Sequence, residues 1–426
     1  MRILPWNIMI LHSCGLWGPR KLSSRWKKTL YTTYTSFAIS LVVTFTASGL
    51  IEFFNSINDI NEVVNNSLML LTMGGVCYKI VNFVSKRNEI VKLLKMLKND
   101  ICDPRGTEEI AIQMKFDARC RHNTLLFAGL SEFAAVAVTV NSFLTHVPQR
   151  TLPFKVWLPF DHTSSIGFWI AFFHQILAHA MAATIGSGYD TLFHGVMTQA
   201  CSQLNILKLR FLEMPLSIGT KISDESNVEA IEMEEMKKCV RHHHEILRFV
   251  EWSNDIFGLV IFIQYSVSTF VICVSTYTLA NTSFLIDELI FIIGYLTCML
   301  VQIFLMCWCG NEVIVEVSFE VGKNSTLLHE GEKRFSNECE FAARAEDLCM
   351  IMIRTLKPVK YASGCVLTLS LESYNSVSMH RYMFMYMFIY TYKYKHKNSP
   401  SGPIDRFFGQ RTVYRLNSVK YQSALS

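Results

Sequence analysis

Seven stretches of this chain consist mostly of apolar residues, the last of them short and weak. A helix that crosses a lipid bilayer needs roughly 20 such residues. Because backbone groups inside a bilayer must be hydrogen-bonded internally, only helices and closed barrels span it. The apolar runs are unbroken rather than alternating, which excludes a barrel. The stretches are residues 30–54, 62–84, 125–144, 165–186, 256–280, 289–309 and 361–377.

The composition of the chain agrees with membrane helices. Of its 426 residues, 50% are hydrophobic and only 18% are charged, whereas a soluble protein usually carries about 25% charged residues. A soluble chain of this length normally divides into domains joined by polar linkers, and none is found before the C-terminus. The sequence therefore predicts an all-α membrane protein with seven transmembrane helices.

The distribution of lysine and arginine predicts how these helices are threaded. The segments 1–29, 85–124, 187–255 and 310–360 together hold 29 of these residues, and the loops 51–61, 145–164 and 281–288 together hold two. Basic residues are retained on the cytosolic side, so we expect a cytosolic N-terminus and, after seven spans, an extracellular C-terminus. A G-protein-coupled receptor has the opposite orientation. Residues 1–29 are expected to form a cytosolic segment that lies on the inner leaflet.

Several short motifs along the chain resemble those of a known family. In the family they begin the N-terminal segment, form the second outside loop, precede the fifth helix, follow the sixth and enter the seventh. They are Gly-Leu-Trp-Gly-Pro at 15–19, the Leu-Pro-Phe and Leu-Pro-Phe-Asp elements within 152–161, Cys-Val-Arg-His through Glu-Ile-Leu at 239–247, Cys-Gly-Asn-Glu at 309–312, and Arg-Thr-Leu-Lys-Pro-Val through Leu-Ser-Leu-Glu at 354–372. In order and spacing they resemble the insect odorant receptors.

This resemblance implies a ligand-gated, non-selective cation channel that acts in olfactory signal transduction. Such receptors form heterotetramers with a shared co-receptor subunit in the plasma membrane of olfactory sensory neurons, and cytosolic extensions of helices four to seven form an anchor domain. The chain lacks the co-receptor's long insertion, which favours an odorant-tuning subunit. The seventh helices line the pore, which would place there Leu367, Ser370, Glu372, Tyr374 and Val377.

A volatile, small and apolar ligand calls for a closed, largely apolar and aromatic pocket. Topology places the outer ends of the second, third, fourth and sixth spans together. Methionine adapts to irregular shapes and aromatic rings supply contact area. The candidate pocket residues in these windows are Met69, Met73, Val140, Phe143, Phe168, Phe172, Phe173 and Tyr295.

Lys79 lies inside the second predicted span and Glu132 inside the third. Ionisable groups are costly in a bilayer and usually paired. They lie at similar depth, roughly 7 and 10 Å from the inner ends of their helices, so we predict an ion pair between them. The run His242-His243-His244 cannot converge on one metal ion from a helix, and we expect it on a solvated helix face.

The end of the chain departs from the family pattern. After the seven-helix domain, residues 30–377, a Met/Tyr/Phe-rich run and a basic polar tail extend over 378–426. We hypothesise that this tail is translated non-coding sequence. Asn281, in the acceptor triplet Asn-Thr-Ser of a predicted outside loop, is a candidate for glycosylation.

No catalytic arrangement is recognisable. The chain lacks a phosphate-binding glycine loop, a Gly-x-Ser-x-Gly element and a His-Glu-x-x-His element, so we expect no enzyme, no cofactor, no metal site and no nucleic-acid partner. The alternative functions are a gustatory-type chemoreceptor channel, whose Thr-Tyr…Gln-Phe ending is missing here, and a membrane transporter.

Overall fold

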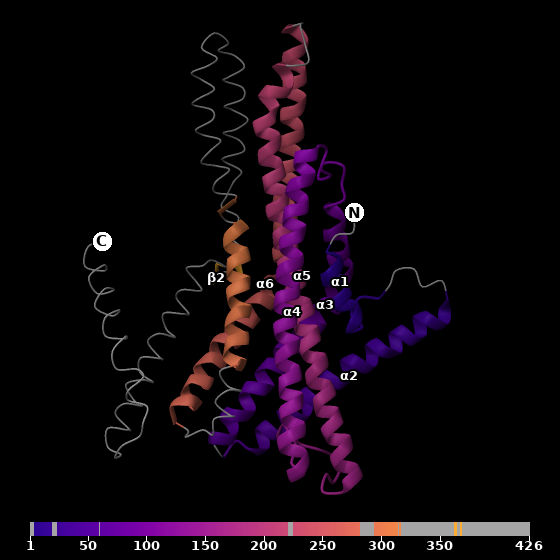
Figure 1. The fold of residues 1–426 in the computed structure, drawn as a ribbon, viewed down its shortest axis with the longest axis vertical. Helices are drawn as coiled ribbons and strands as arrows, with labels where there is room; N and C mark the ends of the chain where they lie inside the picture. Colours follow the sequence, from indigo (N-terminus) through magenta and orange to yellow (C-terminus); the bar gives the residue numbers. More distant parts are fainter. Residues whose placement is uncertain are drawn as a thin grey trace, which may run out of the picture.

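The computed structural model describes residues 4–18, 24–58, 60–219, 225–281, 294–313 and 315–316, together with four residues in two short strands. Its elements are almost all helical (Figure 1). They are α1 (Pro5–Ser13), α2 (Arg25–Asn55), α3 (Ile60–Met96), α4 (Thr107–Gln149), α5 (Ser165–Gly219), α6 (Glu225–Asn281), the helix Gly294–Val313, β1 (Ala362–Ser363) and β2 (Leu367–Thr368).

Six of the described helices are long and apolar enough to cross a membrane: α2 to α6 and Gly294–Val313. They contain the first five predicted spans and most of the sixth, so the prediction of a helical multi-pass membrane protein is confirmed. Most of the seventh predicted span, 361–377, and the whole tail, 378–426, lie outside the described residues.

Four residues of the seventh span differ from the prediction. Ala362 pairs with Thr368 and Ser363 with Leu367 in an antiparallel strand pair. The backbone is therefore extended at these positions instead of helical. A short apolar run that contains a glycine does not distinguish a strand from a helix by its periodicity.

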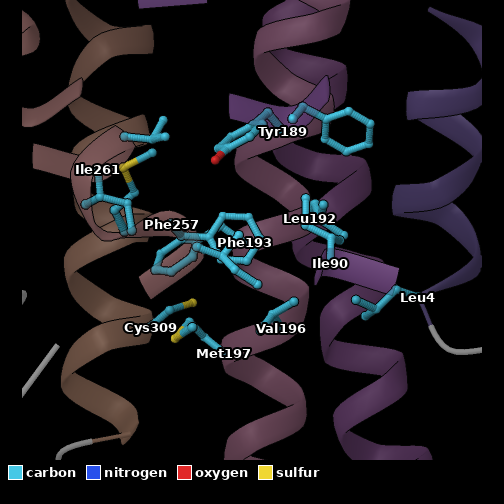
Figure 2. Close-up of a cluster of buried hydrophobic side chains, with 14 of the residues drawn as sticks. Leu4, Ile90, Tyr189, Leu192, Phe193, Val196, Met197, Phe257, Ile261 and Cys309 are labelled. Carbon is cyan, nitrogen blue, oxygen red and sulfur yellow. The ribbon is translucent and has the colours of Figure 1, made fainter. Parts of the chain in front are cut away.

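The helix α5 is the centre of the fold and contacts α1, α2, α3, α4 and α6. Every residue from 185 to 204 is buried. Figure 2 shows Tyr189, Leu192 and Phe193 of this helix in a cluster with Ile90 of α3 and Phe257 of α6. A helix enclosed on all sides in this way has no face left for solvent or lipid over that stretch.

The N-terminal helix α1 packs against α5 and α4. The expectation of a segment on the inner leaflet did not include this contact. Leu4 and Leu11 are buried, and the amide nitrogen of Asn7 donates to the Thr191 carbonyl of α5 at 2.6 Å. Close approach requires Gly195, because a Cβ atom there would lie 2.7 Å from Cδ2 of Leu4. A larger side chain at this position would force the Leu4 side chain to move.

The Gly-Leu-Trp-Gly element after α1 fixes its connection to α2 and α3. Gly15 has a φ of +83°, which side chains disfavour, and its carbonyl accepts a hydrogen bond from Thr35 Oγ1 at 2.6 Å. The Gly18 carbonyl accepts a hydrogen bond from the Arg87 guanidinium at 3.1 Å. The motif thus connects α1 to α2 and α3 through hydrogen bonds to its backbone carbonyls.

The helices α5 and α6 are much longer than a membrane requires. They contain 55 and 57 residues, which correspond to about 80 and 85 Å at 1.5 Å per residue. They run side by side beyond the other described helices at the top of the view (Figure 1). Both helices continue beyond the predicted spans into the segment 187–255, and the position of this segment on the cytosolic side of the bilayer stays a prediction.

Candidate functional site

A cavity of about 230 Å³ lies between α2, α3 and the segment that joins α4 to α5. We call it the α2–α3 cavity, and residues 150–164 the joining segment. Small-ligand sites are typically concave and largely apolar, with a few polar groups that fix orientation. The lining residues are Phe45, Thr46 and Gly49 of α2, Asn66, Met69, Leu70 and Met73 of α3, and Pro153, Phe154, Lys155 and Val156 of the joining segment.

The joining segment is held against the bundle by a buried amide. Gln175 of α5 is completely buried; its Oε1 accepts from the Phe154 backbone N–H at 3.0 Å, and its Nε2 donates to the Phe154 carbonyl at 3.1 Å. The Trp157 N–H donates to the Ser48 carbonyl of α2 at 3.2 Å. Both backbone polar groups of Phe154 are satisfied by a single side chain, so the wall of the cavity has a defined position.

The aromatic ring of Phe154 is also fixed. It packs edge-on against Phe45 of α2, with ring centroids 5.6 Å apart, and lies 5.5 Å from the His179 ring of α5. Edge contacts of this kind contribute about 0.5–1.5 kcal/mol beyond the area that they bury. The ring therefore lines the cavity in one orientation.

The polar side chains of the lining differ in whether they are already bonded. Thr46 Oγ1 donates to the Val42 carbonyl at 2.7 Å, and Lys155 forms a salt bridge with Glu62 at 2.5 Å. Asn66 Nδ2 is buried and has no hydrogen-bond partner. Among the lining side chains, which all belong to the described part of the chain, Asn66 is thus the one with a buried donor to spare.

Two of the eight predicted pocket residues, Met69 and Met73, line this cavity. Tyr295 lies nearby in the helix Gly294–Val313, where its hydroxyl is 2.6 Å from Thr72 Oγ1 of α3. The cavity uses α2 and the joining segment, which we did not include in the pocket. Pro153 and Phe154 belong to a recognised motif, and that motif was the signal in the sequence that could have identified this wall.

The other five predicted residues lie between α4 and α5 or on their surface. The rings of Phe143 and Phe172 are 5.0 Å apart, and Phe168 lies 5.8 Å from Phe172. Phe173 and Val140 are 47% and 51% exposed in this chain. The structure gathers the four aromatic rings into one cluster away from the cavity lining, and their part in ligand binding stays a prediction.

The predicted ion pair between Lys79 and Glu132 is wrong. Lys79 Nζ lies 2.7 Å from Asp190 Oδ1 of α5, and both side chains are 3% exposed. Glu132 lies beside Thr184, and its Oε1 is buried without a hydrogen-bond partner. The prediction compared depth along two helices, but it had no information on the direction in which each side chain points.

The pair belongs to a chain of hydrogen bonds that joins four helices. Gln302 Nε2 of the helix Gly294–Val313 donates to Asp190 Oδ2. Gln264 Nε2 of α6 donates to Gln302 Oε1 at 3.0 Å. Buried charges need such additional hydrogen bonds to offset their loss of hydration, so Lys79, Asp190 and the two glutamines form one buried polar network.

A second polar cluster lies beyond the predicted spans, around Arg210 of α5. Its guanidinium bonds the Glu109 carboxylate of α4 through two nitrogens at 2.8 Å each. It also donates to the carbonyls of Ile101 at 2.6 Å and Asp103 at 2.9 Å. The remaining N–H points at His242 Nδ1, 3.2 Å away. All five donors of the guanidinium are used, which ties α4, α5, α6 and the α3–α4 connection together.

The expectation that the three consecutive histidines are solvated is wrong for two of them. His242 and His243 are buried, whereas His244 is exposed. Burial and the neighbouring Arg210 guanidinium lower the pKa of His242 to about 3. The neutral ring accepts from Arg210 at Nδ1 and lies 2.9 Å from Gln203 Oε1 at Nε2. The packing of α6 on α5 covers this face, which the local sequence alone does not reveal.

The remaining predicted sites are described only in part. Asn281 is the last residue of α6, and the rest of its acceptor triplet lies outside the described residues. Of the predicted pore residues, Leu367 is in β2, and Ser370, Glu372, Tyr374 and Val377 are outside the described residues. Within the described part, no group of three or more His, Cys, Asp or Glu side chains could hold a metal ion.

Comparison with known proteins gives consistent matches. A family model described as 7tm Odorant receptor matches residues 59–320. Odorant receptor Or1 of Anopheles gambiae is 24% identical over 88% of this chain and 92% of its own. Odorant receptor 46a, isoform A, of Drosophila melanogaster is 25% identical over 71% of this chain and 77% of its own.

Solved structures show the same fold. The insect olfactory receptor OR5 from Machilis hrabei aligns with a TM-score of 0.71 at 19% identity, over 90% of this chain and 96% of that chain. Its complex with eugenol aligns with a TM-score of 0.74 at 17% identity, over the same shares of both chains. With the family model covering more than half of its length, this chain belongs to the 7tm odorant receptor family.

Proposed function

We propose that this chain is an odorant-tuning subunit of a ligand-gated, non-selective cation channel. It would act with a shared co-receptor subunit in the plasma membrane of olfactory sensory neurons. The observation that carries the proposal is the largely apolar α2–α3 cavity, which has the composition of a small-ligand site. The eugenol complex of a receptor with the same fold supports ligand binding by this architecture.

The distribution of basic residues supports an outward-facing cavity. The predicted outside segment 145–164 contributes one wall of the cavity. Its only lysine and arginine residues are Arg150 and Lys155. The segment 85–124, at the other end of α3 and α4, carries nine lysine and arginine residues. Basic residues favour the cytosolic side, so the N-terminus would be cytosolic and a volatile ligand would reach the cavity from outside.

The pore assignment is part of the same proposal. The seventh helix of each subunit would line a central channel, with Leu367, Ser370, Glu372, Tyr374 and Val377 along it. In this structure the residues of β1 and β2 form a strand pair. The pore assignment requires these residues to be helical in the assembled channel.

Co-expression with an odorant co-receptor in a cell without added G protein tests the function. We expect odorant-evoked cation currents. The variant Met73→Trp would fill the cavity, since Met73 lines it and is 3% exposed, and would abolish the response at unchanged surface level. Met114→Trp, at a position 60% exposed on α4, is the matched control and should respond like the unmodified chain.

One observation favours the transporter alternative. A buried ion pair such as Lys79–Asp190 often marks an ion or proton pathway in membrane proteins. A transporter would accumulate tracer without channel-sized currents. Tracer uptake in the absence of an odorant-evoked current would favour the transporter and overturn the proposed receptor function.

A further inference from the structure

Two adjacent glycines, Gly74 and Gly75, lie inside α3, between the part of this helix that lines the α2–α3 cavity and the buried residue Lys79. After proline, glycine is the least favourable residue in a helix interior. A glycine pair in a helix is explained by a left-handed backbone, by the close approach of another element, or by a capacity to bend. The structure tests the first two explanations directly.

Neither a backbone requirement nor close packing accounts for this pair. The helix α3 continues without interruption through both residues, and the only described glycine with a positive φ is Gly15. A Cβ atom at Gly74 would meet no described atom within 4 Å, and one at Gly75 would meet only Gln264 Oε1 of α6, at 3.9 Å. Alanine would therefore fit at both positions, which leaves the capacity to bend as the explanation.

The two halves of α3 on either side of the glycines are packed differently. None of the described side chains of 62–72 is buried. The half that follows the glycines is fixed in the core of the bundle, and its charged residue Lys79 pairs with Asp190 of α5 at 2.7 Å. Its buried residues are Val76, Lys79, Ile80, Phe83, Ile90, Leu93 and Leu94. A segment with few buried contacts moves more readily than one in the core, so the first half is the one free to move.

Movement of the first half of α3 would act in two places at once. Met69 and Met73 line the α2–α3 cavity. Thr72 Oγ1 lies 2.6 Å from the hydroxyl oxygen of Tyr295, at the start of the helix Gly294–Val313. A change in the position of the methionines would therefore be passed on to Tyr295 and to the helix that carries it.

We propose that α3 bends at Gly74 and Gly75 when the α2–α3 cavity is occupied. The first half of α3 then moves together with the helix Gly294–Val313, while the second half stays fixed on α5. A hinge of this kind consists of a few residues that absorb the backbone change of a larger rearrangement. The inference rests on the proposed function and assigns to it the residues at which the receptor bends.

The variants Gly74→Ala and Gly75→Ala test the hinge, because each favours the straight helix without a clash. Each should raise the thermal unfolding midpoint of the detergent-solubilised receptor by roughly 2 °C. In cells that express the full-length receptor with a co-receptor, each should also raise the half-maximal concentration of eugenol or acetophenone roughly threefold to fivefold. A variant that is more stable and less sensitive is not explained by misfolding.

The matched control is Gly129→Ala in α4. This glycine also lies in a helix long and apolar enough to cross a membrane, and an added Cβ would meet no described atom within 4 Å. The control should gain the same stability and keep its sensitivity. An unchanged or lower half-maximal concentration for both α3 variants would overturn the inference. Loss of co-purification with the co-receptor would also overturn it, since the glycine would then make room for another subunit.

Hydrogen exchange of the full-length receptor in detergent tests the hinge without a ligand. Residues 74–79 include buried positions, whereas none of 129–134 is buried, so a rigid α3 would exchange more slowly over 74–79 than α4 does over 129–134. The hinge predicts the reverse, and slower exchange over 74–79 in the double variant Gly74→Ala, Gly75→Ala. Slower exchange over 74–79 than over 129–134 in the unmodified receptor would overturn the inference.

The hinge and the proposed function fail differently. Silence to every odorant, with the receptor and co-receptor both at the cell surface, would overturn the proposed function. Fast exchange over 74–79 in the same receptor would leave the hinge itself standing.

Discussion

The buried pair Lys79–Asp190 should contribute strongly to stability only as long as both partners are present. The two charges are 2.7 Å apart and both side chains are 3% exposed. Asp190→Leu leaves an ammonium group buried without its counter-charge and deprives Gln302 of its acceptor. Breaking one side of such a pair costs about 3–5 kcal/mol. We expect Asp190→Leu and Lys79→Met each to reduce stability by this amount.

The double variant is the informative one. Replacing both partners by apolar residues of similar size is often neutral or stabilising, so Lys79→Met combined with Asp190→Leu should recover most of the loss. The thermal unfolding midpoint of detergent-solubilised receptor, followed by size-exclusion chromatography, ranks the four proteins. Lys95→Met, at an exposed position of α3, is the control. A double variant no more stable than the poorer single variant would refute the reasoning.

Three further perturbations follow from single contacts. Arg210→Ala should lower the stability of the fold by about 3–5 kcal/mol. Arg210→Lys should also lower the thermal unfolding midpoint, because an ammonium group cannot fill five donor positions. A lysine variant as stable as the original would contradict this geometry. Gln175→Leu leaves the Phe154 peptide unpaired at a cost of about 1–3 kcal/mol, so limited proteolysis of residues 150–164 should be faster; an unchanged rate would argue against the clamp. Gly195→Val should clash with the Leu4 side chain and lower stability by about 1–3 kcal/mol through overpacking. Adding Leu4→Ala should restore part of the unfolding midpoint; no rescue would place the clash elsewhere.

The membrane helices were predictable because bilayer burial depends on composition over a window, which any sequence displays. Runs such as 30–54 and 165–186 are mostly apolar without a clear polar face, and the structure places each in a long helix. The same property hides the packing. A helix that is apolar all round gives no periodic signal of which face meets protein and which meets lipid, so Val140 was assigned to a pocket although it is 51% exposed.

The cavity was predictable only in part for a related reason. Met69 and Met73 were chosen because α3 was expected at the ligand site, and they do line the cavity. Its other wall depends on Gln175, whose side chain bonds a peptide 21 residues earlier in the chain. Nothing local to Gln175 indicates this contact, because a glutamine inside a span could equally bond a neighbouring helix or a water.

The partner of Lys79 shows how far a depth argument can go. Counting residues from the inner ends of two helices placed Lys79 and Glu132 at similar heights, which is necessary for contact. It is not sufficient, because successive residues of a helix point about 100° apart and the azimuth of each side chain follows from tertiary packing. Asp190 lies four residues beyond the apolar run, which ends at 186. The structure continues α5 as a buried helix beyond that point. The fall in hydropathy after 186 therefore does not mark the end of the buried helix, and the charge that Lys79 needs lies just past it.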